Sequence, residues 1–335
     1  YCFEYMNLTL ILKNVLTIFL GFFLSLIILE IVLRVLGYTP WKYDKSNNSS
    51  IYRFDNELGW ISKIGKYRVN ISEYNPSTFE ITIDQDSSRS IDGNADKNEI
   101  IFIGGSFTQG WGVNDDETFS YLVQKKIRTH RVKNFGQGGY SSVQSYLLLK
   151  RLFENKIKPK LVIYSFIDHH EYRNVARGEW LRMLLKHSNA GHETPPKVPF
   201  VTINKNKEIN FHEPVGYPMF PLRESLSLVN ILEANYAKFI TKKRKKMQKD
   251  VLRQLVLEMK KLTKINNSNF LFLNLKSEII EHENFLRKNK VDYVDCNFKL
   301  SKETLLVGDY HPNMKAHKLY EECITSYLKR GNLLF

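Results

Sequence analysis

The chain begins with a long apolar stretch. Residues 15–29 carry no charge and little polarity, and apolar residues continue on both sides, so the pattern predicts a helix of about 30 residues. A bilayer core needs about 20 predominantly apolar residues, and Lys13 and Arg34 can reach the headgroups from the two ends. We therefore expect a single transmembrane anchor over residues 7–37.

Two alternatives to an anchor stay open. A cleaved signal peptide needs a small-x-small cleavage site, and residues 37–41 contain none. A buried helix of a soluble protein needs a second segment apolar enough to cover it, and the sequence offers none.

Residues 38–98 are polar and rich in Ser, Asn and Asp, with aromatic residues interspersed. The short alternating run 79–83 predicts a strand. We expect this segment to form a collar of strands and loops between the anchor and the body of the protein.

From residue 99 onward, apolar runs typical of buried strands alternate with helical patterns. The expected strands are 100–103, 132–135, 161–166, 270–275 and 291–294, and the expected helices are 119–127, 142–153, 278–287 and 314–328. This order predicts a three-layer α/β/α domain with a parallel sheet over residues 99–335.

The alternation is interrupted between about residues 171 and 249. This part predicts a hairpin (201–203 with 208–211) and two helices whose apolar residues share one face each: Leu228, Leu232, Tyr236 and Phe239 in the first, and Val251, Leu255, Met259 and Leu262 in the second. We interpret it as an insertion or lid of the same domain.

The composition adds a net charge of +14, from 49 Lys+Arg against 35 Asp+Glu. Nucleic-acid binding is disfavoured, because no basic stripe interleaved with aromatic residues and no known reader motif is present. The run 242–246 (KKRKK) is most simply a solvated helix end, and anionic lipid headgroups or an acidic glycan are its alternative partners.

Three cysteines (Cys2, Cys296 and Cys323) exclude a disulfide framework and a Cys-built zinc site.

Three short segments carry candidate chemistry at the ends of expected strands. Ser106 follows the first strand, where parallel sheets bind ligands and helix N–H groups can stabilise an oxyanion. Gly139 lies in a glycine-rich loop after the second strand, and Asp309 and His311 precede the last helix, where they could supply a base and the carboxylate that orients it. Taken one at a time, these segments read equally well as a helix cap, a plain turn and a Pro-containing turn.

Their order along the chain resembles the SGNH (GDSL-like) hydrolase family. GGSFTQG around Ser106 is similar to the nucleophile block, NFGQGGYS around Gly139 to the second block, and GDYHPNMKAH around Asp309 and His311 to the last. The resemblance implies a flavodoxin-like fold, a Ser106–His311–Asp309 triad, no cofactor or metal, and an oxyanion hole built from the N–H groups of Ser106 and Gly139.

One block departs from the family pattern. Where the family usually places an Asn that completes the oxyanion hole, this chain reads SFIDHHE, with no Asn before Asn174. We expect His169 to substitute as the donor, because an ionised Asp168 would repel an oxyanion. A metal site made by His169 and His170 with His187 or His192 is a weaker alternative.

The resulting expectation is a membrane-anchored serine esterase that hydrolyses or transfers an acyl group, foremost acetyl, on an envelope glycan or lipid. The alternatives are a glycan O-acetyltransferase partner and a catalytically silent glycan-binding or scaffold protein. The resemblance places the body outside the cytoplasmic membrane, which would allow a Cys296–Cys323 bridge. The charges flanking the apolar run favour the opposite orientation, since Lys13 alone precedes it and Arg34, Lys42, Lys45 and Arg53 follow.

Overall fold

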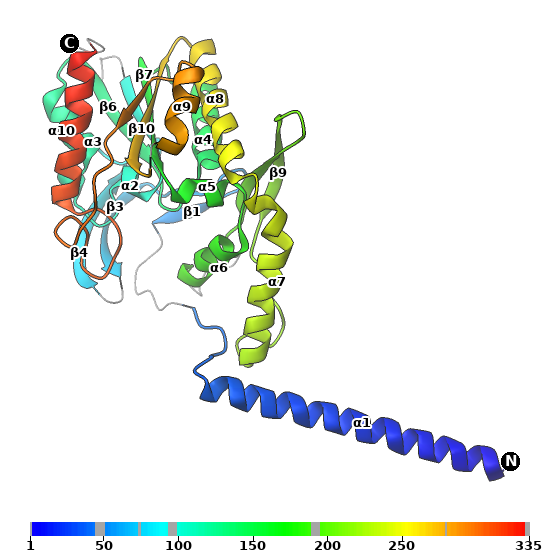
Figure 1. The fold of residues 1–335 in the computed structure, drawn as a ribbon. Helices are drawn as coiled ribbons and strands as arrows, with labels where there is room; N and C mark the ends of the chain where they lie inside the picture. The colour runs from blue at the N-terminus through cyan, green and yellow to red at the C-terminus, as the bar shows by residue number, and fades with distance from the viewer. Residues whose placement is uncertain are drawn as a thin grey trace.

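The computed structural model describes residues 2–43, 51–72, 75–92, 99–188, 195–278 and 280–331. A long N-terminal helix projects from an α/β body (Figure 1). Within the described residues, one segment, Leu10–Val35, is long and apolar enough to cross a membrane, and it is not buried against the body.

The body is built on a five-stranded parallel sheet. Its strands are β5 (Glu99–Gly104), β6 (Arg131–Gly136), β7 (Leu161–Ile167), β10 (Asn269–Lys276) and β11 (Tyr293–Asp295). Their spatial order, β11-β10-β7-β5-β6, is the flavodoxin-like order 2-1-3-4-5. The expected α/β fold with a parallel sheet is thereby confirmed. The strand order reverses at β5 and β7, so the connections that follow these two strands cover opposite faces of the sheet.

Helices cover both faces of this sheet. On one face α3 (Phe119–Lys126) and α10 (Met314–Arg330) share an apolar cluster with the sheet, and on the other α4 (Ser142–Glu154), α8 (Gln248–Ile265) and α9 (Ile280–Lys288) do the same. The buried faces of these helices carry Leu, Val, Ile, Met and aromatic residues at helical spacing, as amphipathic crossover helices require.

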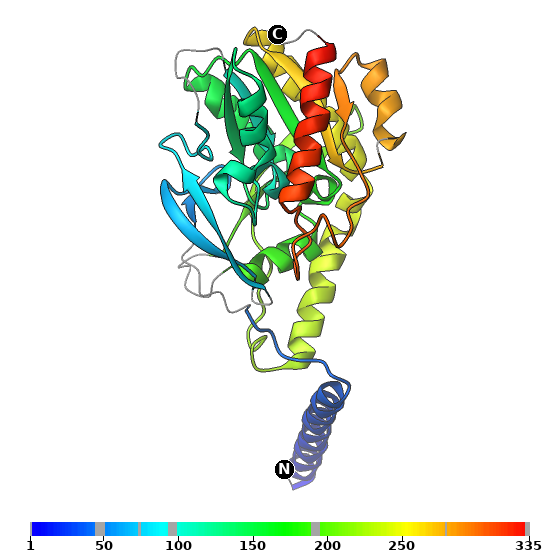
Figure 2. The ribbon, with the colours of Figure 1, turned by 90° about the vertical axis from the view of Figure 1, so that its left-hand side faces the viewer.

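The segment expected to form a collar contains two antiparallel hairpins. They are β1 (Tyr52–Asp55) with β2 (Gly59–Ser62), and β3 (Gly65–Ser72) with β4 (Asn75–Ile83). The β3–β4 hairpin lies on the outside of the body (Figure 2). A bridge from Arg89 to Asn134 connects this segment with the edge strand β6.

The segment between α5 (His169–Asn174) and α8 forms α6 (Gly178–His187), the hairpin of β8 (Val198–Ile203) and β9 (Ile209–Val215), and α7 (Ser227–Lys245). The expected hairpin is confirmed. The two expected helices differ in what their apolar faces do: that of α8 is buried, whereas that of α7 points outward and its polar face packs on the body.

Cys296, directly after β11, forms a disulfide with Cys323 in α10. The bridge joins the edge of the sheet to the helix that covers it. Disulfides persist in oxidising compartments and are rare in the cytosol.

Replacing Cys296 and Cys323 together by Ala should lower the free energy of unfolding by about 3–4 kcal/mol, because the bridge closes a loop across a sequence separation of 27. Urea unfolding of the detergent-solubilised chain, with and without reductant, measures this. Cys2→Ala serves as the matched control and should leave the midpoint unchanged. A midpoint that neither reductant nor the double replacement moves would contradict a stabilising bridge.

Candidate active site

Ser106 lies at the carboxyl end of the central strand β5. It is the first residue of the short helix α2 (Ser106–Gln109), it is almost fully buried, and its N–H is at the free amino end of that helix. The connections that leave the carboxyl ends of β5 and β7 run to opposite faces of the sheet, and such folds bind ligands at this point. The residue is therefore held by a strand end, not by a mobile loop.

Ser106, His311 and Asp309 form one continuous hydrogen-bonded chain. His311 Nε2 lies 2.8 Å from Ser106 Oγ, and His311 Nδ1 lies 2.5 Å from Asp309 Oδ1. The same carboxylate oxygen accepts the backbone N–H of His311 at 2.9 Å. The structure thus brings together three residues that are up to 205 positions apart in the sequence.

Asp309 remains an anion next to the imidazole. Burial raises the pKa of its carboxyl group, but hydrogen bonds from the His311 ring and backbone and from the Trp111 side chain outweigh burial and lower the pKa below its usual value. An ionised carboxylate at Nδ1 fixes the tautomer whose Nε2 can accept a proton.

Two backbone N–H groups follow the carboxyl ends of β5 and β6. Neither the Ser106 N–H nor the Gly139 N–H has an acceptor among the described residues. Gly139 adopts φ +78°, and a Cβ at this position would come within 3.1 Å of the Trp60 ring and 3.5 Å of the Trp180 ring. A glycine here lets the loop adopt a positive φ and pass close to two indoles.

His169, the expected third donor, lies at the rim of this region. Its side chain is about one-third exposed, with Nε2 3.8 Å from Asp168 Oδ1 and the ring beside Tyr172. Burial and the nearby positive charge of Arg173 lower the pKa of His169 to about 4. A neutral imidazole still has one N–H to donate, but the exposure of this ring and its acidic neighbour make His169 a weak candidate for the missing donor.

The neighbouring His170 is fully buried and points the other way. Its Nδ1 lies 2.7 Å from the Tyr164 hydroxyl, and its Nε2 faces Gly105, where a Cβ would approach it to 2.8 Å. Burial and the charge of Arg173 lower the pKa of His170 well below its usual value, so the ring is neutral. This contact explains why the residue before Ser106 is a glycine.

Arg173 supplies a buried positive charge next to Gly105 and Tyr140, which adjoin Ser106 and Gly139 in the chain. Its guanidinium donates from Nη1 to Tyr140 O at 3.1 Å and stacks on Trp180 at 4.3 Å, and Nη1 would lie 3.7 Å from a Cβ on Gly105. Its Nε has no hydrogen-bond partner, and within the described residues no carboxylate lies at ion-pair distance. Asp168 is a counter-charge beyond ion-pair distance, and a buried cation without a direct ion pair is expensive, so its position needs a reason beyond stability.

The sequence did not single out Arg173. Read as a helix, residues 169–174 place His170, Arg173 and Asn174 on one face, because residues three and four apart are neighbours on a helix. The segment is only six residues long, and the sequence pattern predicts no helix there. A helical interpretation of these residues would have pointed to Arg173.

The collar also contributes to the site, which the sequence did not indicate. The guanidinium of Arg89 is fully buried and donates to Asp115 Oδ1 and to the carbonyl oxygens of Gln109, Gly110, Val113 and Glu80. Gln137, two residues before Gly139, accepts from Ser62 N and Oγ. The segments that follow Ser106 and precede Gly139 are therefore braced from outside the α/β body.

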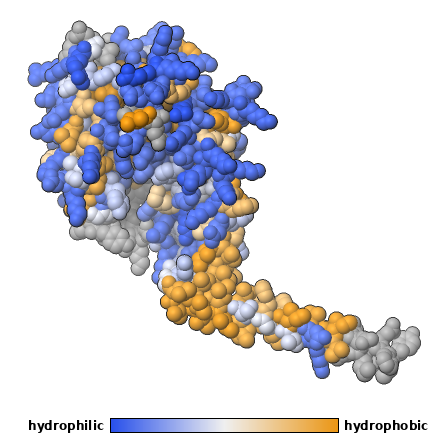
Figure 3. All heavy atoms as spheres, in the orientation of Figure 1, coloured by the Kyte–Doolittle hydropathy of each residue, from blue (hydrophilic) through white to orange (hydrophobic). Residues whose placement is uncertain are grey.

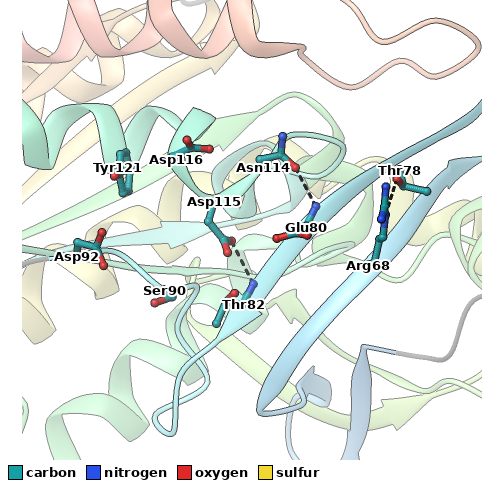
Figure 4. A pocket seen from close by; sticks show the side chains of 10 residues that line it. All are labelled: Arg68, Thr78, Glu80, Thr82, Ser90, Asp92, Asn114, Asp115, Asp116 and Tyr121. Carbon is teal, nitrogen blue, oxygen red and sulfur yellow. Dashed lines mark hydrogen bonds between the residues drawn. The ribbon is translucent and has the colours of Figure 1, made fainter.

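No metal site is found in the part of the chain that the structure describes, where no group of three His, Cys, Asp or Glu side chains could hold an ion. His192, one of the weaker candidates, lies outside the described residues. A polar hollow of about 630 Å³ lies over β4 and the 3₁₀ turn Asp115–Glu117 (Figure 4), and none of the residues that line it belongs to the triad. Its Asp115 binds Arg89 and the Thr82 N–H.

Buried neutral histidines predict a loss of stability in mild acid. His317 is fully buried, its Nδ1 accepts from Phe119 N at 3.1 Å, and burial with the nearby charge of Arg89 lowers its pKa to about 3. Below pH 6.5 the unfolded chain binds a proton that the folded chain refuses, so stability falls as the pH falls, by up to about 1.4 kcal/mol per pH unit per histidine.

Urea unfolding between pH 7.5 and pH 4 tests this expectation. His317→Asn keeps an acceptor for the Phe119 N–H but removes the titrating ring, so its free energy of unfolding should depend less steeply on pH than that of the parent. Equal slopes would contradict the assignment of the acid sensitivity to this ring.

No protein-family model and no curated protein matches the chain. Among solved structures it is similar to a member of the lipolytic protein G-D-S-L family from Veillonella parvula, at 10% identity and a TM-score of 0.40, covering 69% of this chain and 98% of that one. It is also similar to a family two carbohydrate esterase from Clostridium thermocellum (11%, TM-score 0.35, 71% and 65%). A third is the catalytic domain of a peptidoglycan O-acetyltransferase from Streptococcus pneumoniae (8%, TM-score 0.31, 70% and 95%). Likenesses this distant say nothing about chemistry, which has to be inferred from the site itself.

Proposed function

We propose that the chain is a serine esterase that works by acyl transfer through Ser106, His311 and Asp309. The observation that carries the proposal is the hydrogen-bonded chain from Asp309 through His311 to Ser106 Oγ. A serine, a base within 3 Å of it and a carboxylate that orients the base are the arrangement that nucleophilic acyl transfer needs.

In this mechanism Ser106 Oγ attacks the ester carbonyl carbon while His311 Nε2 takes its proton. The bond to the alcohol oxygen then breaks, and His311 returns the proton to that oxygen, which leaves an acyl-Ser106 intermediate. Water repeats the two steps and releases the acid, or a sugar hydroxyl takes the acyl group instead. Asp309 stabilises the imidazolium that forms in each half-reaction.

The negative oxygen of the tetrahedral intermediate would be stabilised by the N–H groups of Ser106 and Gly139. We assign the third contribution to Arg173 and not to His169. Its buried charge lies against Gly105 and Tyr140, the neighbours of the two N–H donors, whereas His169 lies at the rim. Preformed positive charge in a water-poor site is worth more than the same charge in water.

The substrate we propose is an acyl ester, foremost an acetyl ester, on an envelope glycan or lipid. The sequence resemblance and an anchor that holds the body at a membrane support this class. We further propose that the body lies outside the cytoplasmic membrane. The Cys296–Cys323 disulfide supports an oxidising compartment, against the charge bias around the apolar helix.

The full chain in detergent, assayed with p-nitrophenyl acetate and labelled with a fluorophosphonate, tests the proposed chemistry. An esterase turns over the ester and is labelled on Ser106. Labelling without turnover, followed by acetyl transfer once a sugar acceptor is added, would favour the transferase. Absence of both labelling and turnover would leave the silent binding protein as the better interpretation.

A further inference from the structure

The outward face of α7 carries an apolar stripe that is largely exposed, although the ring of Phe220 lies 5.4 Å from that of Tyr236. Leu232, Tyr236 and Phe239 are exposed, Phe239 to 75%, and their spacing of four and three residues puts them on one side of the helix. We call these three residues the outer stripe. Large apolar side chains on one exposed face are typical of a surface that contacts a partner or a membrane.

The helix cannot turn to bury this stripe. On its inner face Glu233 accepts the Phe220 N–H at 2.7 Å, and Thr241 Oγ1 accepts the Gly178 N–H at 3.0 Å. Gly178 packs so closely on α7 that a Cβ there would come within 2.4 Å of Ala237 O. The polar side is therefore fixed inward and the apolar side outward.

The foot of α7 is attached to the end of the apolar helix α1 (Cys2–Val35). The two carboxylate oxygens of Glu30 accept the N–H groups of Ser227 and Leu228, each at 2.9 Å, and so cap the start of α7. Arg34 donates to Ser225 O at 2.7 Å. These bonds hold α7 in a set position relative to the proposed anchor.

The hydrophobic surface of α1 continues onto the foot of the body (Figure 3). Met219 and Leu222, which shortly precede α7 in the chain, are also exposed. In Figure 1, α1 leaves this foot sideways, toward the side of the body on which α7 lies; α10 lies on the opposite side. A bilayer crossed by α1 would therefore pass close to α7.

Positive charge follows the stripe at the far end of α7. Lys242, Lys243, Lys245 and Lys246 are exposed, and they have no acidic partner among the described residues. Arg244, in the middle of the run, is turned inward and stacks on Phe200 at 4.5 Å. The outward lysines match the headgroups of anionic lipids in charge.

We propose that α7 lies along an anionic membrane surface, with the outer stripe in the interfacial layer and the four lysines against lipid headgroups. Tyr and Phe beside Lys are the residues expected at that depth. The proposal rests on the membrane anchor of the proposed function but not on its ester chemistry. It gives the protein two contacts with one bilayer, one spanning and one lying flat.

Fluorophores on single cysteines of the full chain in lipid nanodiscs test this, in a Cys2→Ser background with the disulfide intact. Phe239→Cys reports on α7, Leu24→Cys on the middle of α1, and Lys318→Cys on α10 at the opposite side of the body. We expect brominated lipid to quench the probe at 24 most, the probe at 239 clearly, and the probe at 318 not at all.

Three results would overturn the proposal, and each has its own pattern. A probe at 239 that iodide reaches as readily as the probe at 318, with 24 quenched by lipid, means that α7 lies free in water. A probe at 239 shielded from both iodide and lipid means that another protein or a second copy covers the stripe. No lipid quenching at 24 means that α1 is not in the bilayer, and p-nitrophenyl acetate turnover in the same sample shows separately whether the ester chemistry holds.

The lysines are tested by lipid charge. Lipid quenching at residue 239 should be stronger in nanodiscs that contain phosphatidylglycerol than in pure phosphatidylcholine. Replacing the four lysines by Gln should remove most of this difference, while Lys260→Gln and Lys261→Gln on α8 should not. Equal quenching in both lipids for the parent chain would overturn the proposed role of anionic headgroups.

Discussion

Replacement of Ser106 by Ala should lower kcat for p-nitrophenyl acetate by about 10⁴-fold or more, to a residual activity that owes nothing to covalent chemistry. The hydroxyl lies 2.8 Å from the base that would activate it, and Ala offers no atom to form an acyl intermediate. Fluorophosphonate labelling should disappear in parallel. The free energy of unfolding should change little, because Ser106 Oγ bonds only to His311 among the described residues.

Ser165→Ala is the matched control. It makes the same chemical change one strand away, at the position of β7 that pairs with Gly104, on a buried hydroxyl that has no hydrogen-bond partner among the described residues. Its kcat should stay within a few-fold of the parent. Because the triad acts as a unit, the double variant with His311→Ala should cost no more than Ser106→Ala alone. Additive losses, or a Ser106→Ala protein as active as the parent, would reject the triad.

Replacement of Arg173 by Met should lower kcat by about 10²–10³-fold, with a much smaller change in KM, if its charge stabilises the oxyanion. The same change should leave the free energy of unfolding equal or higher, because it removes a buried cation that has no carboxylate partner. Activity that falls while stability rises is a pattern that a purely structural role would not produce. Arg173→Lys, which keeps the charge, should recover part of the loss.

His169→Gln is the companion variant, since it separates the two candidates for the third contribution. It should retain kcat within about threefold of the parent, because the ring lies at the rim beside Asp168. If His169→Gln costs more activity than Arg173→Met, the assignment reverses and the original prediction for His169 stands.

The sequence predicted the layers of the fold because each buried strand is a continuous apolar run. Such a run can be recognised as a buried strand without knowing which residues pack against it. Ser106, Asp309 and His311 were found from their order along the chain and their places at strand ends. Arg173 was missed because a six-residue helix is too short to show a period. The braces at Arg89 and Gln137 were missed because most of their partners are backbone groups that only tertiary contact brings near.

The outward apolar face of α7 shows a different limit of sequence patterns. The apolar residues of α7 have the same spacing as the buried residues of α8: they are Leu228, Leu232, Tyr236 and Phe239. Hydrophobic periodicity alone therefore predicts that both helices bury their apolar faces. What decides is the other side of α7. Glu233 and Thr241 bind backbone N–H groups of the body, and no periodicity reports such bonds.

Because the carboxylate of Glu30 caps α7, proteolytic removal of the apolar helix would lower the stability of the body. The residue at the N-cap of α7, Leu226, has no side-chain hydrogen-bond acceptor. The first N–H groups of α7 are therefore bound by Glu30, which belongs to the apolar helix. A peptidase that cut between this helix and the body would strip the cap, at a cost of about 0.5–2 kcal/mol to the helix. Secretion by cleavage would thus release a weakened product, and a truncated form intended for crystallisation should begin ahead of Glu30.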